Sequence, residues 1–157
     1  MWHWFFDLFC LALLFFFMVD QLTFLWVRRV YYLAYRLMIW SKGYVIFIDI
    51  DNFKKFNDEY GYETGDKVLR RVGVILLTET RLRAFRWGGE ELCILLPWFR
   101  KEKAVQLAER MRRRVQEASI GGLTVTISCG VAKYEEDARR LLQAAKNNGK
   151  NQVLVLE

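Results

Sequence analysis

The spacing of apolar and polar positions divides the chain into helices and strands. Residues 2–19 are almost continuously apolar, which predicts a hydrophobic N-terminal helix. Helical spacing predicts further helices at 22–40, after 51, from 66, at 101–118 and at 136–147. Runs of β-branched and aromatic residues predict strands at 44–50, 83–87, 91–96, 123–131 and 152–156. This order predicts an α+β domain with a split βαβ layout, in which a sheet carries helices on one side.

The N-terminal helix has the composition of a membrane anchor. At ~1.5 Å per residue, residues 2–19 reach about the thickness of the hydrocarbon core of a bilayer. The segment lacks the positive start and the small-residue cleavage site of a signal peptide. We therefore expect an uncleaved anchor at 1–19, followed by a domain at 20–157. Asp7 and the short length also fit a helix that pairs with its copy or with the domain itself.

Basic residues after this segment predict its orientation. Residues 1–27 carry no Lys or Arg, whereas residues 28–42 carry four. The positive-inside rule therefore predicts a cytoplasmic domain that is tethered to the inner face of the cell membrane. Within 22–40, aromatic residues and arginines alternate in a way that suits a membrane surface, a dimer partner or both, and we expect a membrane contact through residues 1–40. A plain core helix fits the 22–40 pattern equally well.

Composition indicates one packed domain. The 157 residues are 54% hydrophobic and include one proline. A formal net charge of +6 fits nucleic acid, an anionic membrane or a nucleotide, but the arginines form no aromatic-interleaved platform, so we expect no nucleic acid partner. Cys10, Cys93, Cys129 and the single histidine, His3, show no zinc-binding spacing. We expect these cysteines to be reduced, buried and inert.

Two acidic side chains end the predicted strand 44–50. Asp49 and Asp51 come where the backbone N–H groups of a following helix point outward and can bind phosphate. A carboxylate at such a place can hold the Mg²⁺ of a phosphate ligand. The alternative is that Asp51 or Asn52 caps the next helix, and for Asp51 the cap is favoured.

A second acidic cluster occupies residues 86–92, RWGGEEL, between two strand-like runs. Gly88 and Gly89 permit the positive φ of a two-residue hairpin turn. Glu90 and Glu91 then lie near the tip of the hairpin. Alone, this fragment is also compatible with an ordinary hairpin whose acids are solvated.

Several motifs at matching spacing resemble the GGDEF family of diguanylate cyclases, from about residue 20 to residue 155. They are DQLTFL at 20–25, DIDNFKKFND at 49–58, YGYETGD at 60–66, RWGGEEL at 86–92, SCGVA at 128–132 and AKNNGKN at 145–151. The resemblance implies a palm-like, ferredoxin-like nucleotidyl cyclase fold with a central, mostly antiparallel sheet flanked by helices. It also implies condensation of two GTP molecules into cyclic di-GMP with release of two pyrophosphates.

The resemblance further implies the roles of individual residues. Metal ligands would be Asp49, Glu90 and the carbonyl of Ile50, which would hold Mg²⁺ or Mn²⁺, two ions per active site. Glu91 would assist deprotonation of the attacking hydroxyl or bind the second metal, so that the catalytic residues are Asp49, Glu90 and Glu91.

The remaining implied residues bind substrate. Phosphates would be held by the backbone of Asn52 and Phe53 and by Lys54, Lys146 and Lys150. The guanine edge would be recognised by Asn57 and Asp66, because an amide and a carboxylate match its carbonyl oxygen and N–H donors. Each half-site holds one GTP, so activity would require a homodimer.

Departures from the family pattern keep two alternatives open. Phe24 and Val27 replace the glycine and asparagine of the opening motif, and Tyr62 stands where a histidine is common. Because these positions border the nucleotide pocket, they leave open a synthase of another cyclic nucleotide. The other alternative is a catalytically silent GTP-binding signalling module, against which the intact acids at 49, 90 and 91 argue.

Overall fold

A computed structural model describes residues 3–156 and contains a six-stranded sheet in the order β1-β3-β4-β2-β5-β6. The strands are β1 (Trp26–Val27), β2 (Tyr44–Ile50), β3 (Ala84–Gly88), β4 (Glu91–Leu96), β5 (Ile127–Ala132) and β6 (Val153–Val155). The pairs β2–β4, β2–β5 and β3–β4 are antiparallel, whereas the edge pairs β1–β3 and β5–β6 are parallel. The prediction of an α+β domain with a central, mostly antiparallel sheet is confirmed.

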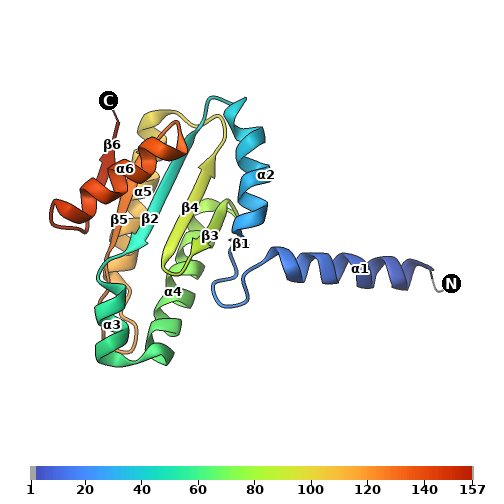
Figure 1. Ribbon diagram of the computed structural model, residues 1–157, viewed down its shortest axis with the longest axis horizontal. Helices are drawn as coiled ribbons and strands as arrows, with labels where there is room; N and C mark the ends of the chain where they lie inside the picture. The colour runs from blue at the N-terminus through green and yellow to red at the C-terminus, as the bar shows by residue number, and fades with distance from the viewer. Residues whose placement is uncertain (1–2, 157) are drawn as a thin grey trace.

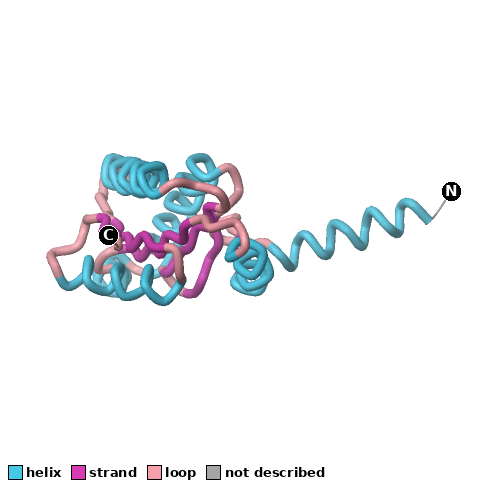
Figure 2. Tube along the Cα trace, turned by 90° about the horizontal axis from the view of Figure 1, so that it is seen from above, coloured by secondary structure: helices cyan, strands magenta, loops and turns pink. Residues whose placement is uncertain are grey.

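Helices cover both faces of this sheet (Figures 1 and 2). They are α1 (His3–Met18), α2 (Arg28–Ile39), α3 (Phe53–Tyr60), α4 (Tyr62–Thr80), α5 (Lys101–Glu117) and α6 (Glu135–Asn147). Ile46 and Ile48 of β2 pack in the core cluster that includes α4 and α5. Val45 and Phe47 point the other way, into the cluster with α2 and α6. The expectation of helices on one side only is therefore wrong, because β2 is apolar on both faces and each face needs cover.

The predicted helix at 22–40 is shorter than expected and begins at Arg28. Before it, the Asp20 carboxylate accepts hydrogen bonds from the backbone N–H and the hydroxyl of Thr23, at 2.9 and 2.7 Å. Such local side-chain bonds compete with helix formation and favour a turn. The chain then pairs Trp26 and Val27 with β3 as the edge strand β1.

Helix α1 extends away from the rest of the domain (Figures 1 and 2). Across residues 3–156, no helix combines the length and apolar character needed to cross a membrane. The spanning anchor predicted for 1–19 therefore has no support from the structure. Cys93 and Cys129 are buried free thiols as predicted, but Cys10 on α1 is only partly covered.

Candidate active site

The register between β2 and β4 brings the two acidic clusters together. Asp49 is paired directly with Glu91, and directly paired residues place their side chains on the same face of a sheet. Gly88 also pairs with Glu91, so the two-residue turn of the hairpin consists of Gly89 and Glu90. The turn is thus one residue later than predicted from the two glycines, and Glu90 lies at its tip.

Asp49 is a buried carboxylate with an incompletely satisfied oxygen. The residue is 4% exposed, and Lys146 Nζ lies 2.9 Å from its Oδ1. This ion pair is the only polar contact of Oδ1 with the described residues. Burial raises the pKa of Asp49 to about 6, with Glu90 and Glu91 adding to the rise and Lys146 opposing it. Concentrated negative charge of this kind attracts a cation.

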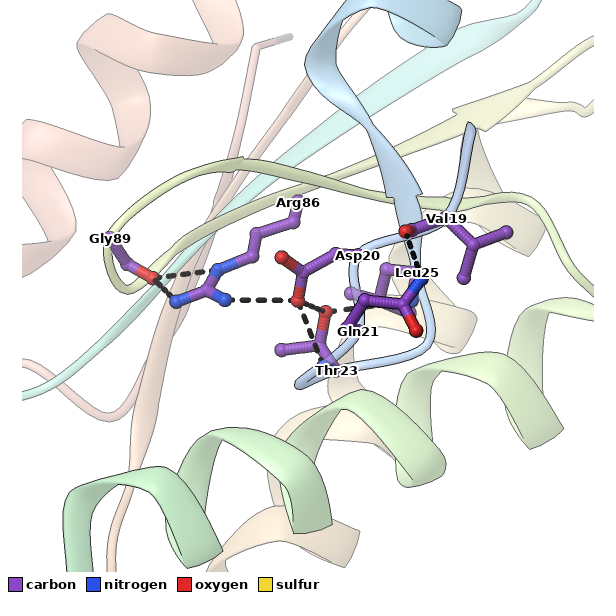
Figure 3. Close-up of polar contacts among 7 residues, drawn as sticks. All are labelled: Val19, Asp20, Gln21, Thr23, Leu25, Arg86 and Gly89. Atoms are coloured by element: carbon purple, nitrogen blue, oxygen red, sulfur yellow. Dashed lines mark hydrogen bonds and ion pairs between the residues drawn. The ribbon is translucent and has the colours of Figure 1, made fainter. Parts of the chain in front are cut away.

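Arg86 fixes the turn of the hairpin to the segment that follows α1 (Figure 3). Its Nε and Nη2 donate to the Gly89 carbonyl at 3.1 and 2.9 Å, and its Nη1 donates to Asp20 Oδ1 at 2.9 Å. Although burial opposes the effect, hydrogen bonds from Thr23 and Arg86 hold the pKa of Asp20 below its usual value. Sequence reasoning assigned Asp20 and Arg86 no role, and the signal that could have found them is their place in the two matching motifs.

Trp87 of β3 packs against helices α2 and α6 and strand β2. Its ring packs edge-on against Tyr31 of α2, with centroids 4.8 Å apart, and against Phe47 of β2 at 5.1 Å. The guanidinium carbons of Arg28 and Arg139 lie 4.3 and 5.2 Å from the ring centroid. These contacts fix Trp87, the residue before Gly88, to α2 and α6.

Asp51 does not cap α3, contrary to the favoured expectation. Its carboxylate accepts hydrogen bonds from Thr126 Oγ1 and Ser128 Oγ, both at 2.7 Å, and from the backbone N–H of Asn151 at 3.0 Å. These bonds tie the end of β2 to β5 and to the segment that carries Lys150. Asp51 therefore has a structural role beside the acidic site.

The start of α3 leaves backbone donors available next to the acids. Asn52 is the N-cap residue with φ 57°, and no side chain caps the helix. The first N–H groups of an α-helix lack intrahelical partners and attract anions. Phe53 is buried and Lys54 exposed, so this terminus offers N–H groups and a lysine where phosphates are expected.

Helices α3 and α4 meet at Asn57 and Gly65. Asn57 Oδ1 is buried without a hydrogen-bond partner among the described residues. Gly65 lies inside α4 rather than in a loop, and a Cβ placed there would be 1.8 Å from this oxygen. Only glycine permits this approach, and Asp66 follows directly on the same helix, exposed. An unsatisfied buried amide beside an exposed carboxylate fits a ligand that donates hydrogen bonds.

A cavity of about 330 Å³ adjoins the acids and is lined by Asp49, Glu91, Glu136, Arg139, Arg140, Leu142, Gln143 and Lys146. Of the predicted residues, it brings together Asp49, Glu91 and Lys146. The predicted substrate residues of α3 and α4, and Lys150, do not line it. Across residues 3–156, no three Asp, Glu, His or Cys side chains are grouped closely enough to hold a metal. The unsatisfied Asp49 oxygen flanked by Glu90 and Glu91 nevertheless fits a divalent ion that oxygen ligands hold.

The sequence profile of one protein family, described as diguanylate cyclase, GGDEF domain, matches residues 17–152. The chain belongs to the GGDEF family. Its relatives include the diguanylate cyclase DgcM of Escherichia coli, 42% identical over 122 residues, which are 70% of this chain and 30% of DgcM. The GGDEF chain spans between 26% and 36% of the length of the first four curated relatives it matches.

Solved structures agree with this membership. The diguanylate cyclase SiaD of Pseudomonas aeruginosa, solved with its activator SiaC, is 30% identical with a TM-score of 0.85, covering 99% of this chain and 68% of SiaD. The coiled coil and GGDEF domain of DgcB from Caulobacter crescentus gives a TM-score of 0.89 at 23% identity, covering 96% of this chain and 91% of that one. The latter likeness concerns the fold alone.

Proposed function

We propose that this GGDEF chain is a diguanylate cyclase that condenses two GTP molecules into cyclic di-GMP and releases two pyrophosphates. The observation that carries the proposal is the pairing of Asp49 with Glu91, next to Glu90 at the hairpin tip and Lys146 on α6. Such an arrangement places acid and base groups within one water-accessible cavity. The same carboxylates count against a catalytically silent module.

Asp49, Glu90 and the carbonyl of Ile50 hold divalent metal in this proposal, Mg²⁺ or Mn²⁺, with two ions per active site. The ions supply positive charge that activates a hydroxyl and offsets charge on a departing pyrophosphate. Ile50 is the last residue of β2, so its carbonyl follows Asp49 along the same strand end. Lys146 of α6 pairs with the Asp49 carboxylate at 2.9 Å.

The chain's own residues bind and orient the substrate. The uncapped N–H groups at Asn52 and Phe53, together with Lys54, Lys146 and Lys150, bind the phosphates. Asn57 Oδ1 accepts an N–H of guanine and Asp66 accepts another, a pattern that adenine does not match. Glu91, opposite Asp49, accepts the proton of the attacking 3′-hydroxyl.

The reaction requires a homodimer, because each copy binds one GTP and the two nucleotides must come into contact. Helix α1 supports such pairing, since it exposes Leu11 at 63% and Phe17 at 74% to solvent. Apolar side chains exposed at this density commonly mark an interface. The DgcB structure with a TM-score of 0.89 contains a coiled coil together with its GGDEF domain.

A contact of residues 1–40 with the inner face of the cell membrane belongs to the same proposal, without a spanning helix. Leu37 and Trp40, at the end of α2, are 71% and 89% exposed, and the helix carries Arg29 and Arg36. Apolar and basic side chains together suit an anionic lipid surface. Co-sedimentation with phosphatidylglycerol vesicles, beside phosphatidylcholine vesicles, checks this contact.

The deciding experiment incubates the purified chain with GTP and Mg²⁺ and measures cyclic di-GMP. We expect product from the wild type and a loss of ~10²- to 10⁴-fold in Glu91→Gln, which removes the proton acceptor. GTP binding should remain in that variant, and Glu102→Gln, an exposed change on α5, should be fully active. Parallel reactions with ATP, CTP and UTP check base choice. Absence of cyclic di-GMP at high protein concentration would overturn the proposal.

A further inference from the structure

Arg139 is an unpaired cation beside the proposed catalytic carboxylates. It lines the same cavity as Asp49 and Glu91. The other two cations of that cavity have partners, since Arg140 pairs with Glu136 and Lys146 with Asp49. Among the residues that the structure describes, the Arg139 side chain has neither an ion pair nor a hydrogen bond. Its side chain is exposed, so its N–H donors are available to a ligand that enters the cavity.

Aromatic rings hold this guanidinium in place. Its central carbon lies 5.2 Å from the ring centroid of Trp87 and 5.3 Å from that of Phe47. Arginine stacks in this way while its N–H groups stay free at the edge of the plane. Arg139 is thus positioned in advance without the use of its hydrogen-bonding capacity.

The cavity extends from the acids along α6. Arg139, Gln143 and Lys146 follow one face of α6 at spacings of four and three residues. Arg139 is two turns, or ~10 Å, before Lys146, whereas Lys150 comes after it. Apart from Lys146, none of the residues proposed to bind the phosphates or guanine of the first GTP lines this cavity.

We infer that Arg139 binds a phosphate oxygen of the second GTP, the nucleotide that the partner copy brings to the hairpin. This inference rests on the proposed function. A second nucleotide carries further negative charge toward Asp49, Glu90 and Glu91, and repulsion there must be offset for the two nucleotides to meet. A planar guanidinium matches two phosphate oxygens at once, which suits this task better than a point charge.

Two variants separate the charge of Arg139 from its packing. Arg139→Met keeps an apolar stem over the rings but removes the charge, whereas Arg139→Lys keeps the charge but loses the planar fork. We expect Arg139→Met to form cyclic di-GMP ~10- to 100-fold more slowly at saturating GTP, with partial recovery in Arg139→Lys. GTP affinity, measured by calorimetry with Mg²⁺, should stay within about twofold of wild type. Arg113→Met, an exposed change on α5, is the matched control for lost charge.

Three results would overturn the inference. Product formation by Arg139→Met at the wild-type rate would reduce Arg139 to a packing residue. A fall in GTP affinity equal to the fall in rate would assign it to the chain's own GTP. If Arg139→Met does not fold, Arg139→Gln replaces it. Wild-type activity of Arg139→Gln would then likewise reduce Arg139 to a packing residue. Failure of the proposed function itself is distinct, because the wild type would then make no cyclic di-GMP.

Discussion

Asp49 lies in β2, and Asp51 follows directly after Ile50, the last residue of that strand. All of the bonding of Asp51 is directed to β5 and the segment after α6, through Thr126, Ser128 and Asn151. Within the described part of the chain, Asp49 has a single polar partner, Lys146, whose ammonium lies 2.9 Å from Oδ1. Because one cation is its only partner there and three hydrogen bonds occupy Asp51, Asp49 is the one of the two that is suited to bind a metal ion.

Asn57 offers a test in which binding and stability should separate. In Asn57→Ala, GTP affinity should fall ~10- to 100-fold, because the amide oxygen that accepts from guanine is gone. The free energy of unfolding should change by less than about 1 kcal/mol, since the buried Oδ1 has no protein partner to lose. Calorimetry with GTP and urea unfolding measure the two quantities.

The control for Asn57 is Glu59→Ala, an exposed change on the same helix that should affect neither quantity. A residue that only supports the packing of α3 on α4 would behave differently. In that case Asn57→Ala would lose stability and GTP affinity together, which would contradict a ligand-binding role.

At the scale of single residues, spacing along the chain predicted the acids and lysines but not their partners. The family resemblance predicted that Asp49 and the acids of the hairpin share one site, whereas the direct pairing of Asp49 with Glu91 depends on the register between β2 and β4. The bonds of Asp51 to residues 75 to 100 positions away, and the ion pair of Arg86 with Asp20, 66 positions away, depend on the tertiary fold. Local patterns contain no such information, so the cap was favoured for Asp51.

At the scale of elements, the prediction succeeded where one segment determines its own structure. Helices α5 and α6 and the strands of the hairpin lie within one or two residues of their predicted bounds. Strand β1 was missed because its two residues become a strand only by pairing with β3. The close packing of β5 against α6 likewise depends on the tertiary fold. A Cβ at Gly130 of β5 would lie 2.0 Å from the carbonyl oxygen of Ala138 in α6, so this position allows no side chain.

Glu79 links α4 to α5 and gives a pH-dependent prediction. Its carboxylate pairs with Arg110 and Arg114 of α5, and hydrogen bonds from Arg110 and then Arg114 hold its pKa below the usual value. A lowered pKa means stabilisation that is present above the unfolded-state pKa near 4.5 and is lost as pH falls through the folded-state value. Glu79→Gln should therefore lower the free energy of unfolding by about 0.5–1 kcal/mol at pH 7, since the arginines are half-exposed.

The difference in free energy of unfolding between wild type and Glu79→Gln should begin to shrink as pH falls below the unfolded-state pKa near 4.5, and it should vanish once pH is below the lowered pKa of Glu79 in the folded protein. Urea unfolding of both proteins across pH 3 to 7 measures this difference in free energy of unfolding. Glu136→Gln serves as the control, because Glu136 and its partner Arg140 are 77% and 72% exposed and such a pair contributes little. A Glu79→Gln difference that is constant across this range would show that the ion pairs do not stabilise the fold.

At the scale of the whole molecule, the two faces of the sheet are used differently. The face under α4 and α5 buries the larger core cluster, whereas the face under α2 and α6 carries the aromatic cluster around Trp87 and, at its end, the acids. Arg86 joins this end to Asp20, and Gln21 donates to the carbonyls of Phe16 and Val19 at the end of α1. Two neighbouring residues, Asp20 and Gln21, thus bond to the hairpin and to the end of the proposed dimer helix, respectively (Figure 3).

Helix α1 gives the prediction that concerns the assembly. Leu8, Leu11 and Leu14 are about 60% exposed and lie toward one side of the helix, whereas Phe15 contacts Trp26 with ring centroids 5.8 Å apart. Changing the three leucines to Gln keeps helix propensity but removes the apolar surface. We expect the variant to be monomeric at micromolar concentration and to lose cyclic di-GMP formation there, because each monomer holds only one GTP.

Because the substitutions leave the site untouched, raising the protein concentration should restore turnover by mass action. Light scattering and turnover across a ~100-fold range of protein concentration measure both effects, with Tyr134→Gln, an exposed change outside α1, as the control. A variant that stays dimeric and active when dilute would remove α1 from the assembly. A dimeric variant that is inactive would instead indicate that α1 acts on the hairpin through Gln21, Asp20 and Arg86, since that connection begins at the end of α1.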